Sequence, residues 1–229
     1  AITTAVREYN EIVVTNVDPL GQGGLQEALD IASGTSFADA LITFDPSLNG
    51  ATIVVEDTLF HTTKRKNDQQ GTIVDGDIDG DGRADITLSG DVRHLLLNNA
   101  SSGEISLELK NIDIAIVESE MAVIENRGLL TLSNVGFENV SSMERALISQ
   151  QGISRDASVT SQDVLFDDIT ISGGEPSGLI FANGPNAKVN VERVGVLQTD
   201  VVASQDGALL VAAINGASGN IGVVAVDDA

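Results

Sequence analysis

Acidic side chains at alternate positions mark one segment of this 229-residue sequence as a candidate metal site. The segment runs from Asp75 to Asp85 and reads DGDIDGDGRAD. Counted from Asp77, carboxylates stand at loop positions 1, 3, 5 and 9, and Gly82 stands at position 6, where a calcium loop turns sharply. The predicted calcium ligands are the side chains of Asp77, Asp79, Asp81 and Asp85 and the backbone carbonyl of Arg83.

The loop is not an EF-hand, because position 12 is Leu88 instead of a bidentate glutamate. The residues around Leu88 alternate between apolar and polar, which is typical of a strand and not of the second helix of an EF-hand. We therefore predict a calcium loop inserted between two strands. The alternative is a solvated acidic turn that binds no ion.

A second set of acids could do chemistry if the strands of the chain stack. Aligned repeats place Glu138 and Asp167 at the same position of adjacent units, with Asp168 beside them. Neighbouring strands lie about 4.8 Å apart, so the two carboxylates could act as general acid and base on a glycosidic bond. The alternative is a solvated corner, which the sequence favours because 34 acidic residues make chance stacking common.

Short alternating strands recur along the chain and would position these groups. Four such segments lie at residues 107–114, 130–137, 159–166 and 189–196. Aligned on Asn111, Asn134, Asp163 and Arg193, they are separated by steps of 23, 29 and 30 residues. Each can bury one face, since side chains alternate across a strand.

A second series of short strands accompanies the first, and most of its members end in an amide side chain. The amides are Asn99, Asn126, Gln150, Asn183 and Asn215. Asparagine tolerates the left-handed conformation of a tight corner, and stacked amides can bond to one another. We therefore predict an inward-facing amide ladder at these five positions.

Repeats of 20 to 35 residues without helical periodicity are typical of a solenoid. The one persuasive helix lies at residues 23–34, where Leu25, Ala28, Leu29 and Ala32 form an apolar stripe and Gly34 suits the C-terminal end. A helix there would cover the open end of the first coil. The sequence predicts one all-β domain over residues 1–229, with a strand and helix cap in 1–50 and coils in 51–229.

Three segments within residues 12–90 resemble bacterial surface proteins with a right-handed parallel β-helix. Residues 23–29, GGLQEAL, resemble the Ser-Leu-Arg-Glu-Ala helix cap of that family, with Gly24 for Ser and Gln26 for Arg. Residues 41–53, LITFDPSLNGATI, and 73–82, IVDGDIDGDG, resemble two further segments of it. The resemblance implies a right-handed parallel β-helix of the pectin-lyase-like kind, found in calcium-rich secreted or surface-anchored proteins, many of them adhesins or stalks.

Composition narrows the function classes. A formal charge of −22 disfavours binding to nucleic acid and to anionic membranes. Without cysteine there are no disulfides, so calcium is the expected stabiliser of a secreted chain. Tryptophan is absent and aromatics are only 3%, which disfavours a dedicated carbohydrate-binding module, and the apolar run at 208–214 is too short to span a bilayer.

The sequence thus predicts a non-enzymatic module of a secreted or bacterial cell-surface protein, in adhesion or extracellular scaffolding, with an extracellular glycan or surface receptor as partner. The alternative is a polysaccharide-active enzyme, a glycoside hydrolase or lyase, that uses Glu138, Asp167 and Asp168. The apolar strand at 220–226 is followed by nothing that could form a capping helix. We therefore expect a longer parent protein with further coils, or self-association at this end.

Overall fold

The computed structural model describes residues 9–34, 39–63, 71–100, 106–144, 146–152, 157–172, 178–201, 209–215, 217–221 and 224–227. Within these ranges the chain is mostly β-strand, with a single α-helix, α1 (Leu25–Gly34), and a short 3-10 helix, η1 (Pro46–Leu48). This agrees with the predicted all-β class. The α-helix lies where the apolar stripe predicts it.

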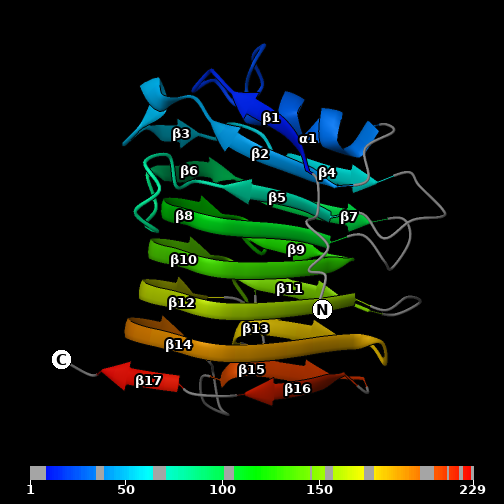
Figure 1. Cartoon of the computed structure of the whole chain (residues 1–229). Coiled ribbons are helices and arrows are strands. Elements are labelled where there is room, and N and C mark those ends of the chain that lie inside the picture. The colour runs from blue at the N-terminus through cyan, green and yellow to red at the C-terminus, as the bar shows by residue number, and fades with distance from the viewer. Residues whose placement is uncertain are drawn as a thin grey trace, which may run out of the picture.

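Two sheets contain all the described strands, and every strand pair in them is parallel (Figure 1). The first has eleven strands: β1 (Asn10–Val14), β2 (Ala40–Phe44), β3 (Thr52–Val54), β5 (Gly71–Asp75), β6 (Ile86–Val92), β8 (Ser106–Ser119), β10 (Leu129–Ser142), β12 (Ala157–Ile171), β14 (Ala187–Val201), β16 (Ser218–Ile221) and β17 (Val224–Asp227). The second has six: β4 (Leu59–Thr63), β7 (Leu96–Ala100), β9 (Ile124–Asn126), β11 (Ile148–Gln151), β13 (Gly178–Asn183) and β15 (Leu209–Ile214). From β7 to β16 the chain alternates between the two sheets.

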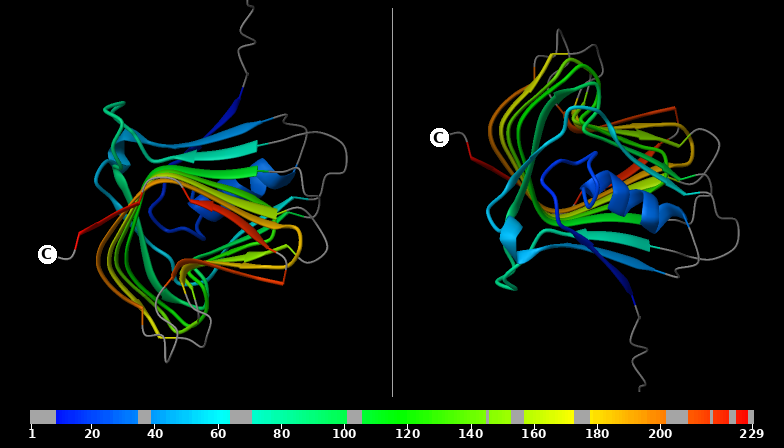
Figure 2. Two further views of the ribbon diagram at one scale, coloured as in Figure 1. Left: turned by 90° about the horizontal axis from the view of Figure 1, so that it is seen from below. Right: turned by 90° about the horizontal axis from the view of Figure 1, so that it is seen from above.

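The repeated segments stack in the predicted register. Leu107, Leu130, Val159 and Val189 are direct partners on adjacent strands, and all four are buried. Viewed along the stack, successive long strands superpose (Figure 2). The apolar faces of the two sheets enclose one core, in which the rings of Phe137 and Phe166 stack with centroids 5.0 Å apart.

Each long strand bends at residues that adopt a left-handed backbone conformation. One row of such residues is Asn111, Asn134, Asp163 and Arg193, with φ between 49° and 54°. A second row is Ile116, Asn139 and Asp168, with φ between 50° and 54°. Among the four asparagines predicted to turn corners in this way, only Asn215 has a positive φ. The prediction was therefore wrong for Asn99, Asn126 and Asn183, and the first row of corners lies at the residues that align the repeats.

Ile116 is the unfavourable member of the second corner row. A β-branched residue in this conformation is strained by about 1–2 kcal/mol, whereas asparagine adopts it readily. The side chain is 70% exposed, so little burial would be lost by replacing it. We expect Ile116→Asn to raise the free energy of unfolding by about 1 kcal/mol, measured by chemical denaturation. Asn139→Ile makes the reverse change on β10 and should lower the free energy of unfolding by a similar amount. An Ile116→Asn variant that is less stable than wild type would show that the backbone at Ile116 is not strained.

Helix α1 covers the core at the N-terminal end of the stack. Leu25, Ala28 and Leu29 are buried against the core, and the partly buried Ala32 packs beside them. Gln26 bonds to the backbone of β4, the end strand of the smaller sheet: its Oε1 accepts from the Phe60 N–H at 2.7 Å and its Nε2 donates to the Phe60 carbonyl at 3.0 Å. An amide side chain thus satisfies backbone groups at the strand edge.

Gly24, directly before α1, lies close to the backbone of the preceding turn. A Cβ atom on Gly24 would lie 2.2 Å from the carbonyl oxygen of Asp18, so no larger residue fits there without a shift of the backbone. The start of α1 therefore requires glycine at this position.

Candidate functional site

The acidic loop, residues 76–85, connects β5 to β6 and is closed at its base. The Asp85 N–H donates to the Gly76 carbonyl at 3.0 Å, so the two ends of the loop lie together. Gly80 and Gly82 have φ of 80° and 83°, a conformation that glycine adopts without strain. These turns direct alternate side chains toward one another.

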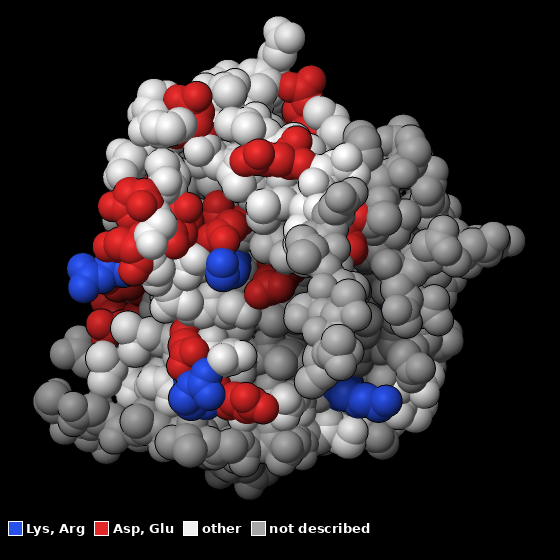
Figure 3. All heavy atoms as spheres, in the orientation of Figure 1, with Lys and Arg blue, Asp and Glu red and all other residues white. Residues whose placement is uncertain are grey.

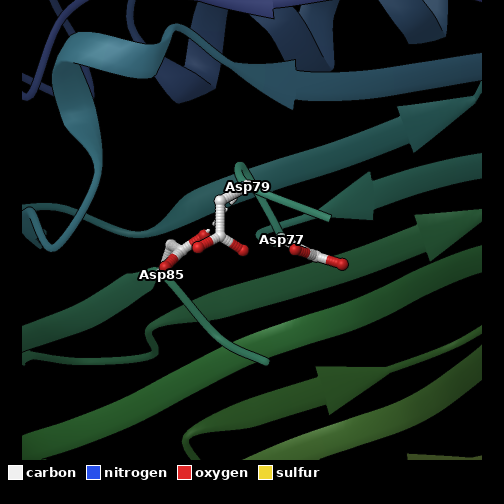
Figure 4. Close-up of side chains that lie close together, drawn as sticks. All are labelled: Asp77, Asp79 and Asp85. Carbon is white, nitrogen blue, oxygen red and sulfur yellow. Dashed lines mark hydrogen bonds between the residues drawn. The ribbon is translucent and has the colours of Figure 1, made fainter. Parts of the chain in front are cut away.

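Three carboxylates of the loop converge. Oxygens of Asp77, Asp79 and Asp85 all lie within 4.8 Å of one another (Figure 4). Backbone N–H groups hold all three side chains in place: Asp77 accepts from Gly80 and Gly82 at 2.7 and 3.0 Å, and Asp79 Oδ1 accepts from the Asp81 N–H at 3.0 Å. Asp85 Oδ2 accepts from the N–H groups of residues 78 and 79, at 2.8 and 3.2 Å.

The structure places the fourth predicted carboxylate differently. Asp81 lies outside the group of three, and its Oδ1 accepts from the Arg83 N–H at 2.9 Å. The Arg83 side chain is exposed, with its Nε 3.9 Å from Asp81 Oδ2. Of the four carboxylates predicted as ligands, the structure therefore brings three together.

The donor set suits a hard divalent cation. Carboxylate oxygens are the preferred ligands of Ca²⁺ and Mg²⁺, and calcium–oxygen bonds of about 2.3–2.6 Å allow two ligands on opposite sides of one ion to be about 4.8 Å apart. Three ligands leave room for water or backbone carbonyls in a shell of six to eight oxygens. Asp77, Asp79 and Asp85 are the residues that would hold the ion.

Asp75 anchors the start of the loop to the neighbouring strand β8. Its Oδ2 accepts from Lys110 Nζ at 2.6 Å, and its Oδ1 accepts from Asn111 Nδ2 at 2.8 Å and from the Asp77 N–H at 3.2 Å. The hydrogen bond to Asp75 raises the pKa of Lys110, and the charge of Asp75 adds to this effect. The spacing of the acids did not indicate this role, although Asn111 stood out as an alignment position.

The acids considered for catalysis lie on the outer face of the larger sheet. Glu138 and Asp167 are direct partners on β10 and β12, as the aligned repeats predict, and Asp168 follows at a left-handed corner. Glu138 and Asp168 are exposed and Asp167 is half-buried. Nearby Asp113 was not predicted: partial burial of its carboxyl raises its pKa, and the charge of Glu138 raises it further.

Acidic side chains also predominate over basic ones on the face shown in Figure 3, among the residues that the structure describes. This follows from the composition, with 34 acidic against 12 basic residues. Such a surface attracts cations and repels polyanions.

An interior amide ladder exists, but its membership differs from the prediction. Asn98, Asn126 and Gln150 are partners on β7, β9 and β11, and each is fully buried. Asn98 Nδ2 donates to Asn126 Oδ1 at 2.7 Å, and Asn126 Nδ2 donates to Gln150 Oε1. Asn98, and not Asn99, therefore occupies the inward position on β7.

Asn183 and Asn215 belong to a second ladder, displaced by one residue from the first. Asn183 pairs with Gln151, not with Gln150, and its Nδ2 donates to Gln151 Oε1 at 3.1 Å. Asn215 Nδ2 donates to Asn183 Oδ1 at 2.8 Å. Asn183 is half-buried and Asn215 is exposed, so this ladder does not face the core. The prediction of a single ladder of five amides was therefore wrong, and the described residues form two shorter ladders instead.

The interior ladder continues into a buried histidine. His61 Nδ1 lies 2.8 Å from Asn98 Oδ1, and its Nε2 lies 3.1 Å from the Thr72 hydroxyl. An amide oxygen only accepts, so Nδ1 carries the proton and Nε2 accepts from Thr72. Burial lowers the pKa of His61, because a charged imidazole would be desolvated in the core.

This lowered pKa predicts a loss of stability in mild acid. Below about pH 6.5 the unfolded chain binds a proton that the folded chain excludes, so the free energy of unfolding falls as pH decreases, by at most about 1.4 kcal/mol per pH unit. We expect wild type to lose stability relative to His61→Gln between pH 7.5 and 5.5, measured by denaturation in chelator. Carboxylates titrate in both proteins and cancel. Parallel stability curves for the two proteins would show that His61 does not titrate as described.

No protein-family model matches the chain, and searches of curated proteins and of solved structures find no match. Within the described ranges, no helix is both long enough and apolar enough to cross a membrane. Function therefore has to be inferred from the residues of the chain itself.

Proposed function

We propose that this chain is a right-handed parallel β-helix stabilised by calcium, and that it serves as a non-enzymatic module of a bacterial secreted or cell-surface protein, in adhesion or extracellular scaffolding. The observation that carries the proposal is the convergence of Asp77, Asp79 and Asp85 in a loop inserted between β5 and β6, two strands that pair one after the other with β8. An ion bound there would stabilise the folded chain only, because the unfolded chain does not assemble these ligands.

The arrangement of the strands supports the β-helix. All described pairs are parallel, and the chain passes alternately from one sheet to the other while successive strands add in order to each stack. The core is continuous through the stack, and α1 covers one end of it. Parallel strands with repeated register are the expected product of a solenoid whose coils are its repeats.

The surroundings of the two histidines support a non-enzymatic role. Both histidines are buried, and their ring nitrogens face structural partners: His61 as described above, and His94 with Nδ1 2.8 Å from the Ala122 carbonyl and Nε2 3.4 Å from a Glu125 oxygen. Neither is available as an exposed base. Calcium and a rigid stack of strands serve a structural module without any further chemistry.

One observation favours the alternative, a polysaccharide-active enzyme. Glu138 and Asp167 are aligned on adjacent strands, and two carboxyl groups side by side are what acid–base cleavage of a glycosidic bond requires. This alignment alone does not create an enclosed site around the carboxylates. The alignment of Glu138 with Asp167 makes a glycoside hydrolase or lyase the second candidate function.

A panel of acidic and neutral polysaccharides, scored for both binding and cleavage in calcium, separates the two functions. We expect no cleavage, and we expect binding to an extracellular glycan or surface receptor to be unaffected by Glu138→Gln. Cleavage that is lost in Glu138→Gln and in Asp167→Asn would establish the enzyme instead. Asp200→Asn, at an acid outside this pair, is the control for a general effect of charge.

A further inference from the structure

We propose that Asn134, which stands outside the acidic loop, is a positioning residue for the calcium site and couples it to the corner of β10, the second strand beyond the loop in the sheet. The inference rests on the proposed calcium function, and it identifies a residue that no ligand spacing would reveal. Asn134 lies on β10, at the left-handed corner where φ is 54°.

The contact spans 52 positions of the sequence. Asn134 Nδ2 donates to the carbonyl of Gly82 at 2.9 Å and also to Asn111 Oδ1 at 2.8 Å. Asn111 in turn donates to Asp75 Oδ1 at 2.8 Å. A chain of hydrogen bonds therefore fastens the loop at its start, through Asp75, and near its end, through Gly82.

The residue held by Asn134 orders the candidate ligands. The N–H of Gly82 donates to Asp77 Oδ2 at 3.0 Å, so fixing residue 82 also fixes the Asp77 carboxylate. Apart from their chain neighbours, Gly80 and Gly82 have no atom within 4 Å of the place where a Cβ would be, so no packing holds the turns on that side. Asn134 supplies the restraint from outside the loop.

Pre-ordering a loop strengthens ligand binding, because the ordering entropy is no longer lost when the ligand binds. Partners that orient metal ligands from outside the first shell typically change affinity by tenfold or more. By thermodynamic reciprocity, an ion in the loop also stabilises the corner at Asn134 and so fastens the loop to both β8 and β10.

The test compares two glycine variants in the same strand. Asn134→Gly and Asn139→Gly each remove an asparagine from a left-handed corner that glycine tolerates, but only Asn134 contacts the loop. We expect calorimetric titration with Ca²⁺ to give a dissociation constant about tenfold higher for Asn134→Gly, and one within about twofold of wild type for Asn139→Gly. Melting temperatures in chelator should be similar for the two variants.

Equal calcium affinities for the two variants would overturn the positioning role while leaving the calcium site intact. If Asn134 had a purely structural role, Asn134→Gly would melt at a lower temperature than Asn139→Gly in chelator, but its dissociation constant for Ca²⁺ would be unchanged. That result would also overturn the inference. If wild type binds no calcium, the metal site itself is wrong and this inference falls with it.

Discussion

Replacing Asn126 with alanine is expected to lower the free energy of unfolding by more than about 3 kcal/mol. This side chain is fully buried at the centre of the interior ladder. Its Oδ1 accepts from Asn98 and from the Gly128 N–H, and its Nδ2 donates to the Gly128 and Ser158 carbonyls at 3.0 Å and to Gln150. Alanine would leave several buried polar groups without partners and would create a cavity, and these two costs add.

Asn99→Ala is the matched control for this prediction. Asn99 is half-buried and lies in a different row from Asn126, so its loss should cost less than about 1 kcal/mol. Urea denaturation of both variants at pH 7.5 gives the comparison. Equal costs at the two positions would mean that the buried ladder does not stabilise the core as the contacts indicate.

Calcium is expected to have the second largest effect on stability. An ion at 100 times its dissociation constant stabilises a folded protein by about 2.7 kcal/mol. In a chain of this size each kcal/mol shifts the melting temperature by about 2–4 °C, so saturating calcium should raise it by about 5–10 °C over chelator. Differential scanning calorimetry measures this shift directly.

Two isosteric variants of the loop sharpen the calcium prediction. Asp85→Asn changes a member of the converging group and should abolish most of the shift, whereas Asp81→Asn lies outside the group and should retain it. Sodium chloride at matched ionic strength controls for screening of the net charge of −22. Equal losses in both variants would indicate diffuse electrostatic attraction instead of a defined site.

Alternation of side chains made the large strands predictable from the sequence. Between the left-handed corners of the long strands, a buried and mostly apolar residue occurs at every second position. A shift of one residue would therefore expose that face. The register of Leu107, Leu130 and Val159 therefore followed from the pattern. The apolar stripe of α1 was equally informative, because Leu25 and Leu29 can be buried together only on one side of a helix.

The amide ladder could not be placed from the sequence because the short strands lack alternation. Residues 95–99 read LLLNN, and both the leucine run and the asparagine pair fit either phase. The structure places Asn98 inward and pairs Asn99 with Thr62. Gln150 and Gln151 present the same ambiguity, and the chain uses both, one in each ladder.

The ligands of the acidic loop could be predicted only in part from the spacing of its acids. Spacing identified the group of acids, but Asp77, Asp79 and Asp81 are equivalent by spacing alone. The path of the backbone around two glycines with positive φ separates Asp81 from the others. The fastening of the loop by Asn134 depends on a contact across 52 positions, which no local pattern contains.

Calorimetric titration of the chelator-treated chain with calcium measures directly whether the acidic loop binds an ion. We expect saturable binding of one ion per chain in wild type, and loss of that binding in Asp85→Asn. Absence of saturable calcium binding in wild type, at calcium concentrations up to the millimolar range of extracellular modules, would contradict the proposed calcium site.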